Sequence, residues 1–347
     1  MMRQYMERPS EIEEKPERGV LGRFGRTLII GGVVAGAVAG VNALVAARAG
    51  TPRHEVGVVF ARYPWRFGDL AYTVAGKGTP MVLVHGLGAG NSMAEWSEAF
   101  PLLREHFTTY AFDFLGWGLS DQPDIEYVAS DYVSQLVGFI EDVVGEPCIV
   151  VASSDGCDYA IQAAARMPNL ISQLVLVCPP LVPKQQAAAP LAKAIETILA
   201  WPVIGATLNN LLTSQRSIDG FARRQLFYDK SLSGESFIKR HSSRAHRGGS
   251  RRSLATFLSG RARVDAREEW SRLEQPALLV WGRNATLNSL ETAPEWLALK
   301  PDARLEVIEE AMLLPHYEHP REWTNRVLDW LQQPSAQSTW PPQEITL

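Results

Sequence analysis

Short aliphatic runs recur along the chain, and each of them predicts a buried strand. They are rich in Val, Leu and Ile, and most of them end at Gly, Pro or Ser, where a chain can turn. The clearest runs cover residues 80–84, 148–152, 174–178 and 277–282. Between the last two, residues 183–266 carry a helical periodicity instead. This pattern predicts a large α/β domain that is interrupted by a helical insertion.

A longer apolar run lies near the N-terminus. Residues 1–27 are polar and mixed in charge, whereas residues 28–47 contain Asn42 as their only polar side chain. A helix of this length is about 30 Å long, enough to cross the hydrocarbon core of a bilayer. The run therefore predicts a single-pass membrane anchor, followed by a linker at residues 48–55. A signal peptide cleaved within residues 47–50 is an alternative, and a buried helix of a soluble protein is another.

Glycines in this run indicate how the predicted helix could pack. Gly32, Gly36 and Gly40 recur every four residues and so share one helix face. Such a face lets a second transmembrane helix approach closely, although the glycines could equally be filler. Basic residues flank both ends of the run, so the positive-inside rule barely discriminates. Lys15 and Arg18 favour a cytoplasmic N-terminus, which would place the large domain on the non-cytoplasmic side.

Three turns that follow predicted strands carry the candidate chemistry. His85-Gly86 is the first, and a turn of the form Asp-x-x-Gly-x-Gly-x-Ser begins at Asp113. The third turn carries Ser154 and runs directly into an Ala-rich helix, with Gly156 as a small flanking residue. A strand, a tight turn with a central serine and then a helix form the layout of a nucleophile elbow.

Taken in this order, the motifs resemble those of the α/β-hydrolase superfamily of esterase- and lipase-like enzymes. The resemblance implies a mostly parallel, eight-stranded sheet flanked by helices, with a helical cap over the active-site cleft. It implies that Ser154 is the nucleophile and that backbone N–H groups of Leu87 or Gly88 and of Asp155 form the oxyanion hole. The implied segments are a core at 56–182 and 267–333, a cap at 183–266 and a C-terminal tail at 334–347.

Two positions depart from the pattern of this superfamily. Glu318 and Pro320 fix the register of the turn that normally delivers the catalytic histidine, and Leu313 stands in the histidine position. The seventh strand normally ends in a turn that carries the catalytic acid, and Ala285 stands in that position. The two losses are coupled, because the acid acts only through the histidine. Asn284 next door is an amide and cannot stabilise an imidazolium.

Another histidine could supply the missing base. His316 lies three residues after the vacant position and is the first alternative. His319 falls at a variable position beside Pro320, and His241 and His246 lie in the predicted cap, from which a side chain could reach the cleft. The alternative is that all four are ordinary surface or wall residues.

Net charge and cysteine content limit the partners and cofactors that the protein is expected to have. The net charge of −4 gives no overall bias toward nucleic acid, and no nucleic-acid partner is expected. The three cysteines are odd in number and lie in or beside predicted core elements, so we interpret them as small buried hydrophobes. Neither a metal-ligand spacing nor a phosphate-binding glycine loop occurs, and no cofactor or metal is expected. Residues 239–252 are strongly basic and predict a solvated face, or a site for anionic lipid or an acidic partner.

Two functions are compatible with these features. The favoured prediction is a membrane-anchored protein of the hydrolase fold that is inactive or very weak, and that binds a lipid-like ligand or serves as a subunit of a membrane complex. The alternative is a membrane-bound serine hydrolase of the esterase or lipase type that uses Ser154 with a relocated base. Retention of Ser154 favours the second prediction, and the losses at 285 and 313 favour the first.

Overall fold

The computed structural model describes residues 35–54, 56, 59–181 and 189–333. The predicted tails at 1–27 and 334–347 lie outside this part of the chain. Residues 28–34 of the predicted anchor, including Gly32, lie outside it as well.

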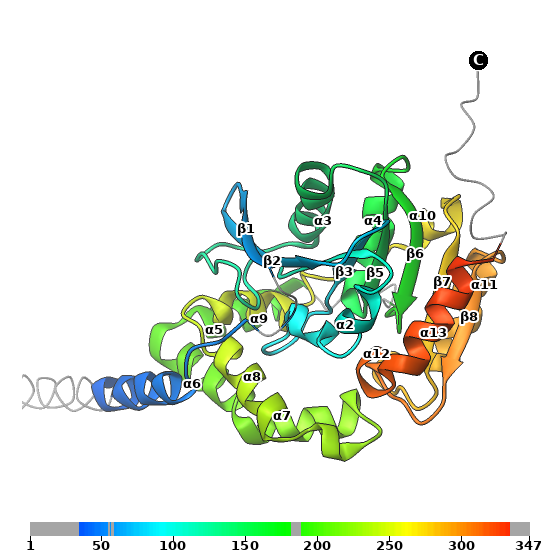
Figure 1. Cartoon of the computed structure of the whole chain (residues 1–347). Coiled ribbons are helices and arrows are strands. Elements are labelled where there is room, and N and C mark those ends of the chain that lie inside the picture. The colour runs from blue at the N-terminus through cyan, green and yellow to red at the C-terminus, as the bar shows by residue number, and fades with distance from the viewer. Residues whose placement is uncertain (1–34, 55, 57–58, 182–188, 334–347) are drawn as a thin grey trace, which may run out of the picture.

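Eight strands form one sheet, and most of its pairs are parallel (Figure 1). Their order is β1-β2-β4-β3-β5-β6-β7-β8, and only the β1–β2 and β2–β4 pairs are antiparallel. Every residue of β3, β5 and β7 is buried, as expected for parallel strands covered by helices on both faces. The predicted eight-stranded, mostly parallel sheet is confirmed. The strands are β1 Val59–Trp65, β2 Gly68–Ala75, β3 Pro80–Val84, β4 Thr108–Phe112, β5 Cys148–Ser153, β6 Ile171–Val177, β7 Ala277–Gly282 and β8 Arg304–Ile308.

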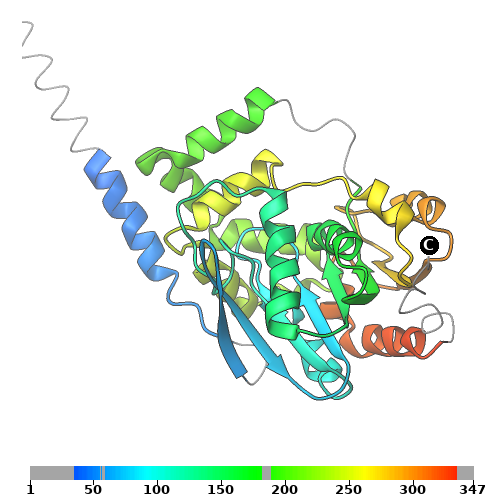
Figure 2. The ribbon, with the colours of Figure 1, turned by 90° about the horizontal axis from the view of Figure 1, so that it is seen from above.

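Helices cover both faces of this sheet (Figure 2). α3, α4, α10 and α11 pack along one face, and α2 and α13 pack together on the other. Their bounds are α2 Phe100–Leu103, α3 Ala129–Phe139, α4 Asp155–Arg166, α10 Arg267–Arg272, α11 Ala293–Leu299, α12 Pro315–Glu318 and α13 Pro320–Leu331. Shorter turns are η1 Met93–Trp96, η2 Ile140–Val144, η3 Ala222–Leu226, η4 Lys230–Leu232 and η5 Leu290–Thr292.

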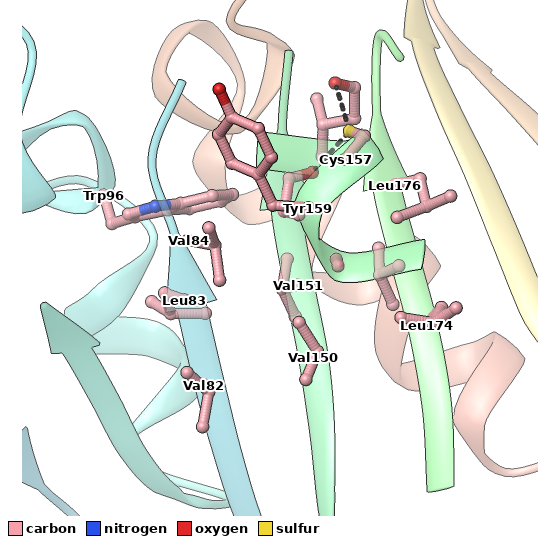
Figure 3. Packing of buried hydrophobic residues seen from close by; sticks show 14 of the residues in the cluster. Val82, Leu83, Val84, Trp96, Val150, Val151, Cys157, Tyr159, Leu174 and Leu176 are labelled. Atoms are coloured by element: carbon pink, nitrogen blue, oxygen red, sulfur yellow. Dashed lines mark hydrogen bonds between the residues drawn. The ribbon is translucent and has the colours of Figure 1, made fainter. Parts of the chain in front are cut away.

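The core lies between the sheet and these helices. Val84 lies in register with Ala152, and Ala152 with Leu176, so these three side chains share the face of the sheet that α4 covers (Figure 3). Cys157 on α4 donates its S–H to the carbonyl oxygens of Ala152 at 3.3 Å and Val177 at 3.5 Å. Cys148, Cys157 and Cys178 are all buried and free, as their interpretation as small buried hydrophobes requires.

The predicted insertion forms a set of helices between β6 and β7, at the end of the sheet where the parallel strands finish (Figure 1). α5 and α6 meet at an angle of 101°. Trp201 between them is extended because a residue that precedes proline avoids the helical conformation, and Pro202 begins α6. The helices are α5 Ala189–Ala200, α6 Pro202–Leu212, α7 Gln215–Phe221, α8 Glu235–Ala245 and α9 Ser250–Ser259.

A helix at Ala35–Arg48 precedes the domain and lies beside the cap. Within the part of the chain that the structure describes, no single helix is both long and apolar enough to cross a bilayer, and the bent α5–α6 pair meets that requirement only as a pair. A Cβ atom added at Gly36 or Gly40 would meet nothing within 4 Å, so this face of the helix is open. The membrane anchor and its glycine face therefore stay predictions.

Candidate active site

Ser154 occupies a strained turn between β5 and α4. Its φ of 48° and ψ of −128° are rare for a residue with a side chain, and such strain is commonly retained at functional sites. The turn is held by the Ser154 N–H, which donates to the carbonyl oxygen of Val177 at 2.9 Å. A Cβ atom at Gly156 would come within 2.9 Å of the His85 carbonyl oxygen, so glycine is needed there for the close approach of α4 to the His85-Gly86 turn. These features form a nucleophile elbow.

A cavity of about 200 Å³ opens above Ser154, between the core and the cap. Leu87, Gly88, Asp155 and Leu313 lie in its wall on the core side, so the structure places five of the predicted site residues around one space. The cap contributes a mostly apolar wall that consists of Leu212, Ile218, Phe221, Leu226, Phe237, His241, Leu254, Phe257 and Leu258. This composition suits a ligand with an apolar body and a carbonyl group near Ser154.

The positions of the catalytic histidine and the catalytic acid carry the apolar side chains of Leu313 and Ala285. Leu313 is nearly fully buried and lines the cavity, and Ala285 is buried in the turn that follows β7. Asn288 from the same loop contacts the serine: its Nδ2 donates to Ser154 Oγ at 3.2 Å and to the Cys178 carbonyl oxygen at 2.7 Å. The sequence points to Asn284, which adjoins the vacant acid position, and not to Asn288. The available signal was a polar residue in a loop at the carboxyl end of a parallel strand.

Glu95 is a second site residue that the motifs of the sequence do not reveal. Its side chain is buried and lines the cavity, and its Oε2 accepts a hydrogen bond from the Gly86 N–H at 3.2 Å. The carboxylate thereby holds the His85-Gly86 turn that precedes the oxyanion-hole residues. The sequence around it, "SMAEWSE", carries no chemical signature that would single it out.

His316, the first alternative base, lies behind Glu95. Its ring is fully buried and stacks on Trp96 with 4.1 Å between the ring centroids, and its Nε2 lies 3.4 Å from Glu95 Oε1. Burial alone would raise the pKa of Glu95, but His316, Ser153 and His85 together outweigh burial and hold that pKa below its usual value. The cavity wall at this point is formed by Glu95, so His316 is placed to act on Glu95 and not directly on Ser154.

Of the other histidines, His241 on α8 lines the cavity. Its Nδ1 lies 3.0 Å from the Phe237 carbonyl oxygen, which requires Nδ1 to carry the proton and leaves Nε2 as the basic nitrogen. Burial lowers the pKa of His241 to about 3, with further lowering from the charges of Arg244 and Arg240. The imidazole is therefore neutral near pH 7 and a weak base.

His246 and His319 are engaged elsewhere. The ring nitrogens of His246 lie 3.3 Å from Thr213 Oγ1 and 2.8 Å from the Ser242 carbonyl oxygen. His319 Nε2 lies 3.1 Å from the carbonyl oxygen of Glu310. Among the four alternatives, only His241 has its side chain in the described wall of the cavity.

Asp155 lies at the oxyanion position as the first residue of α4. Burial raises the pKa of Asp155 to about 6, and the nearby Glu95 charge acts in the same direction. Arg263 and the backbone N–H groups of Asp155 and Leu87 oppose this rise, which means that the carboxylate faces the donors that would stabilise an oxyanion. A charged Asp155 therefore competes with a developing oxyanion for these donors.

This arrangement predicts that the reactivity of Ser154 rises as the pH falls. Reaction of Ser154 with a fluorophosphonate should accelerate as the pH falls through about 6, because protonation removes the Asp155 charge. Asp155→Asn should react at least about tenfold faster at neutral pH, the effect of about 1.4 kcal/mol, and should lose the acceleration. Rates of covalent labelling across a pH series measure both effects. A parallel pH profile in the two proteins would contradict this role of Asp155.

Comparison with known proteins identifies the family. The sequence profile of the alpha/beta hydrolase family matches residues 81–327. The chain belongs to this family. Among its relatives is the 2-hydroxy-6-oxo-6-(2'-aminophenyl)hexa-2,4-dienoic acid hydrolase of Metapseudomonas resinovorans, which is 26% identical over 279 residues, or 76% of this chain and 87% of that protein. The family membership confirms the resemblance seen in the motifs.

Solved structures with the alpha/beta hydrolase fold superimpose on most of the chain. A serine hydrolase involved in carbazole degradation matches with a TM-score of 0.65 and 22% identity, and covers 79% of this chain and 99% of its own. A membrane phospholipase A described as a bacterial virulence factor matches with a TM-score of 0.64 and 18% identity, and covers 90% of this chain and 97% of its own. At these identities the likeness is one of fold.

Proposed function

We propose that this alpha/beta hydrolase family member is a membrane-anchored serine hydrolase that acts slowly on an ester or related carbonyl compound with an apolar body. The observation that carries the proposal is the strained Ser154, which opens into an apolar cavity that His241 also lines. The hydrolase relatives support this alternative better than a function without catalysis. The anchor is the predicted span at 28–47.

The chemistry follows the usual order of acyl transfer. The Ser154 hydroxyl attacks the carbonyl carbon as its proton passes to Nε2 of His241, and the N–H groups of Leu87 and Asp155 stabilise the resulting oxyanion. His241 then returns the proton to the leaving group. Asn288 donates to Ser154 Oγ, so the hydroxyl keeps its own hydrogen for a base. The low pKa of His241 makes this base weak, which is why we expect slow turnover.

Covalent labelling tests the proposal. The detergent-solubilised full chain should react stoichiometrically with a fluorophosphonate, as seen by intact mass, and Ser154→Ala should abolish the adduct. His241→Gln should slow labelling by about 10²–10⁴-fold, the usual contribution of a general base. His246→Gln is the matched control, because it changes the same residue type one turn further along the cap, and it should label at the original rate. Full-rate labelling of His241→Gln would contradict the assignment of the base.

A second function is favoured by the apolar residues at the triad positions. Leu313 and Ala285 leave no imidazole and no carboxylate where the fold normally provides them, and the cavity itself suits an apolar ligand. The chain would then be a binding protein without turnover. Absence of any Ser154 adduct in the intact protein, together with retained binding of a long-chain fatty acid, would favour this function over the hydrolase.

A further inference from the structure

Large apolar side chains are exposed on two helices of the cap that contact each other, and on the N-terminal helix that Asn42 joins to one of them. These side chains are between 41% and 64% exposed to solvent, and soluble domains rarely expose large apolar patches. They belong to α5, α6, the Trp201 bend between them and the helix Ala35–Arg48. They are Leu191, Ile198, Trp201, Ile204, Leu211 and Leu212 of the cap, and Val41 and Leu44 of the N-terminal helix. We refer to these eight residues as the apolar cap face.

A polar clasp fixes the N-terminal helix to the cap. Asn42 Nδ2 donates to Thr207 Oγ1 at 3.0 Å, and Asn210 Nδ2 donates to Asn42 Oδ1 at 3.0 Å. Both partners lie on α6. Asn42 is the only polar side chain in the predicted span, and an amide in a lipid environment needs hydrogen-bonding partners from the protein. The cap provides these partners, which explains why an amide is tolerated at this position.

The position of the clasp along the helix sets the depth of the cap. Asn42 precedes Arg48 by six residues, or about 9 Å of helix. If the apolar run that begins at Leu28 lies in a bilayer with Arg48 at its surface, α6 must lie below the level of the headgroups. The bent α5–α6 pair is apolar enough for this environment, since it meets the requirement for a membrane span as a pair.

Charge near the end of the helix fits the same orientation. An open depression beside Arg48 is lined by Arg53, Lys239 and Arg240, with Glu235 as its acidic member. Lys239 and Glu235 pair at 2.5 Å, so the depression keeps an excess of positive charge. Basic residues just beyond an apolar segment suit the anionic headgroup layer. The basic cap segment predicted from the sequence contributes to this depression.

The apolar cap face also reaches the active-site cavity. Leu212 belongs to both, and Phe221 and Leu258 line the cavity while remaining about two-fifths exposed. An acyl chain that entered beside Leu212 would therefore meet a mostly apolar wall on its way toward Ser154.

We propose that the apolar cap face is embedded in the lipid bilayer that holds the anchor, and that the cavity takes acyl-chain lipids directly from that bilayer. The embedding rests on the clasp and on the exposed apolar residues. The substrate class, in addition, rests on the proposed hydrolase function.

Fluorescent probes on single cysteines test the embedding. The three native cysteines are buried, so Ile204→Cys and Leu211→Cys can be labelled selectively with an environment-sensitive nitrobenzoxadiazole dye. The full chain carries Ser154→Ala and is reconstituted in vesicles of phosphatidylcholine and phosphatidylglycerol, so turnover plays no part. Both probes should be blue-shifted and should lose emission when the lipids carry nitroxide on their acyl chains. Arg321→Cys, exposed on α13 away from the cap, is the matched control and should show neither change.

A variant that lacks the Asn42 hydrogen bonds distinguishes a cap embedded in the bilayer from a domain that is only tethered to it. Asn42→Leu makes the anchor more apolar, so vesicle association should persist while the Ile204 probe shifts toward the emission of the Arg321 control. If the probes at 204 and 211 emit as they do in water while the Asn42 hydrogen bonds are intact, the proposal is overturned. Blue-shifted probes that lipid nitroxide fails to quench would place a protein surface on this face and would overturn it as well. If a fluorophosphonate fails to label Ser154 in the protein that retains this serine, the hydrolase function is refuted, whereas the result of the probe experiment is unaffected.

Discussion

Leu313→His combined with Ala285→Asp is expected to raise ester turnover by about 10²–10⁴-fold, the contribution of a positioned general base. Leu313 and Ser154 line the same cavity, so an imidazole at 313 would face the hydroxyl. Asn288 need not be removed, because a hydroxyl can accept from the amide and still donate to the new base. Initial rates on a p-nitrophenyl ester of medium chain length measure the effect.

The single variants serve as controls for this restoration. Leu313→His alone lacks its orienting carboxylate, and Ala285→Asp alone has no imidazole to orient, so each should give only a small part of the gain. Adding Ser154→Ala to the double variant should abolish the new activity. If the double variant melts like the original protein and remains inert, the assignment of positions 285 and 313 in the register of the fold is wrong.

The predicted site residues that the structure brings together around one cavity are those whose position follows from the backbone. Ser154, Leu87, Gly88 and Asp155 sit at ends of strands in a parallel sheet, and the carboxyl ends of such strands meet at one edge. The order of short motifs along the chain was therefore enough to bring them together. Leu313 could be placed for the same reason, since it follows β8 in a turn whose register Glu318 fixes. Oε1 of Glu318 accepts a hydrogen bond from the Met312 N–H at 2.6 Å.

The residues that the sequence left unassigned depend on where loop side chains point. Asn288 and Glu95 lie in irregular segments, and their contacts with Ser154 and Gly86 are made across the fold. His241 reaches the cavity only because the cap folds back onto the core. Asn42 stood out as a polar interruption of the apolar run, but its partners lie more than 160 residues away. Spacing in the sequence carries no information on such pairs.

The buried pair of Glu95 and His316 predicts a large effect on the free energy of unfolding. His316→Leu keeps an apolar side chain against Trp96 but removes the imidazole from the buried Glu95 carboxylate, which retains only the Gly86 N–H among the contacts described above. Breaking a buried pair in this way costs about 3–5 kcal/mol. Urea denaturation of the core, followed by tryptophan fluorescence, should report a loss of this order. The double variant Glu95→Gln with His316→Leu is the control and should recover part of the loss, because it buries no charge.

The pH dependence of stability distinguishes loss of charge pairing from loss of packing. In the original protein the pKa of Glu95 is below its usual 4.5, so its contribution to stability is present above pH 4.5 and is lost as the pH falls through the lower, folded-state pKa. In His316→Leu the largest influences that lower this pKa are gone, and we expect burial to outweigh the remaining effects of Ser153 and His85 and to raise the pKa above its unfolded value. The sign then reverses, and the deficit relative to the double variant should shrink as the pH falls toward 4.5. A deficit that stays constant with pH would mean that His316 acts through packing against Trp96 and Trp323 alone.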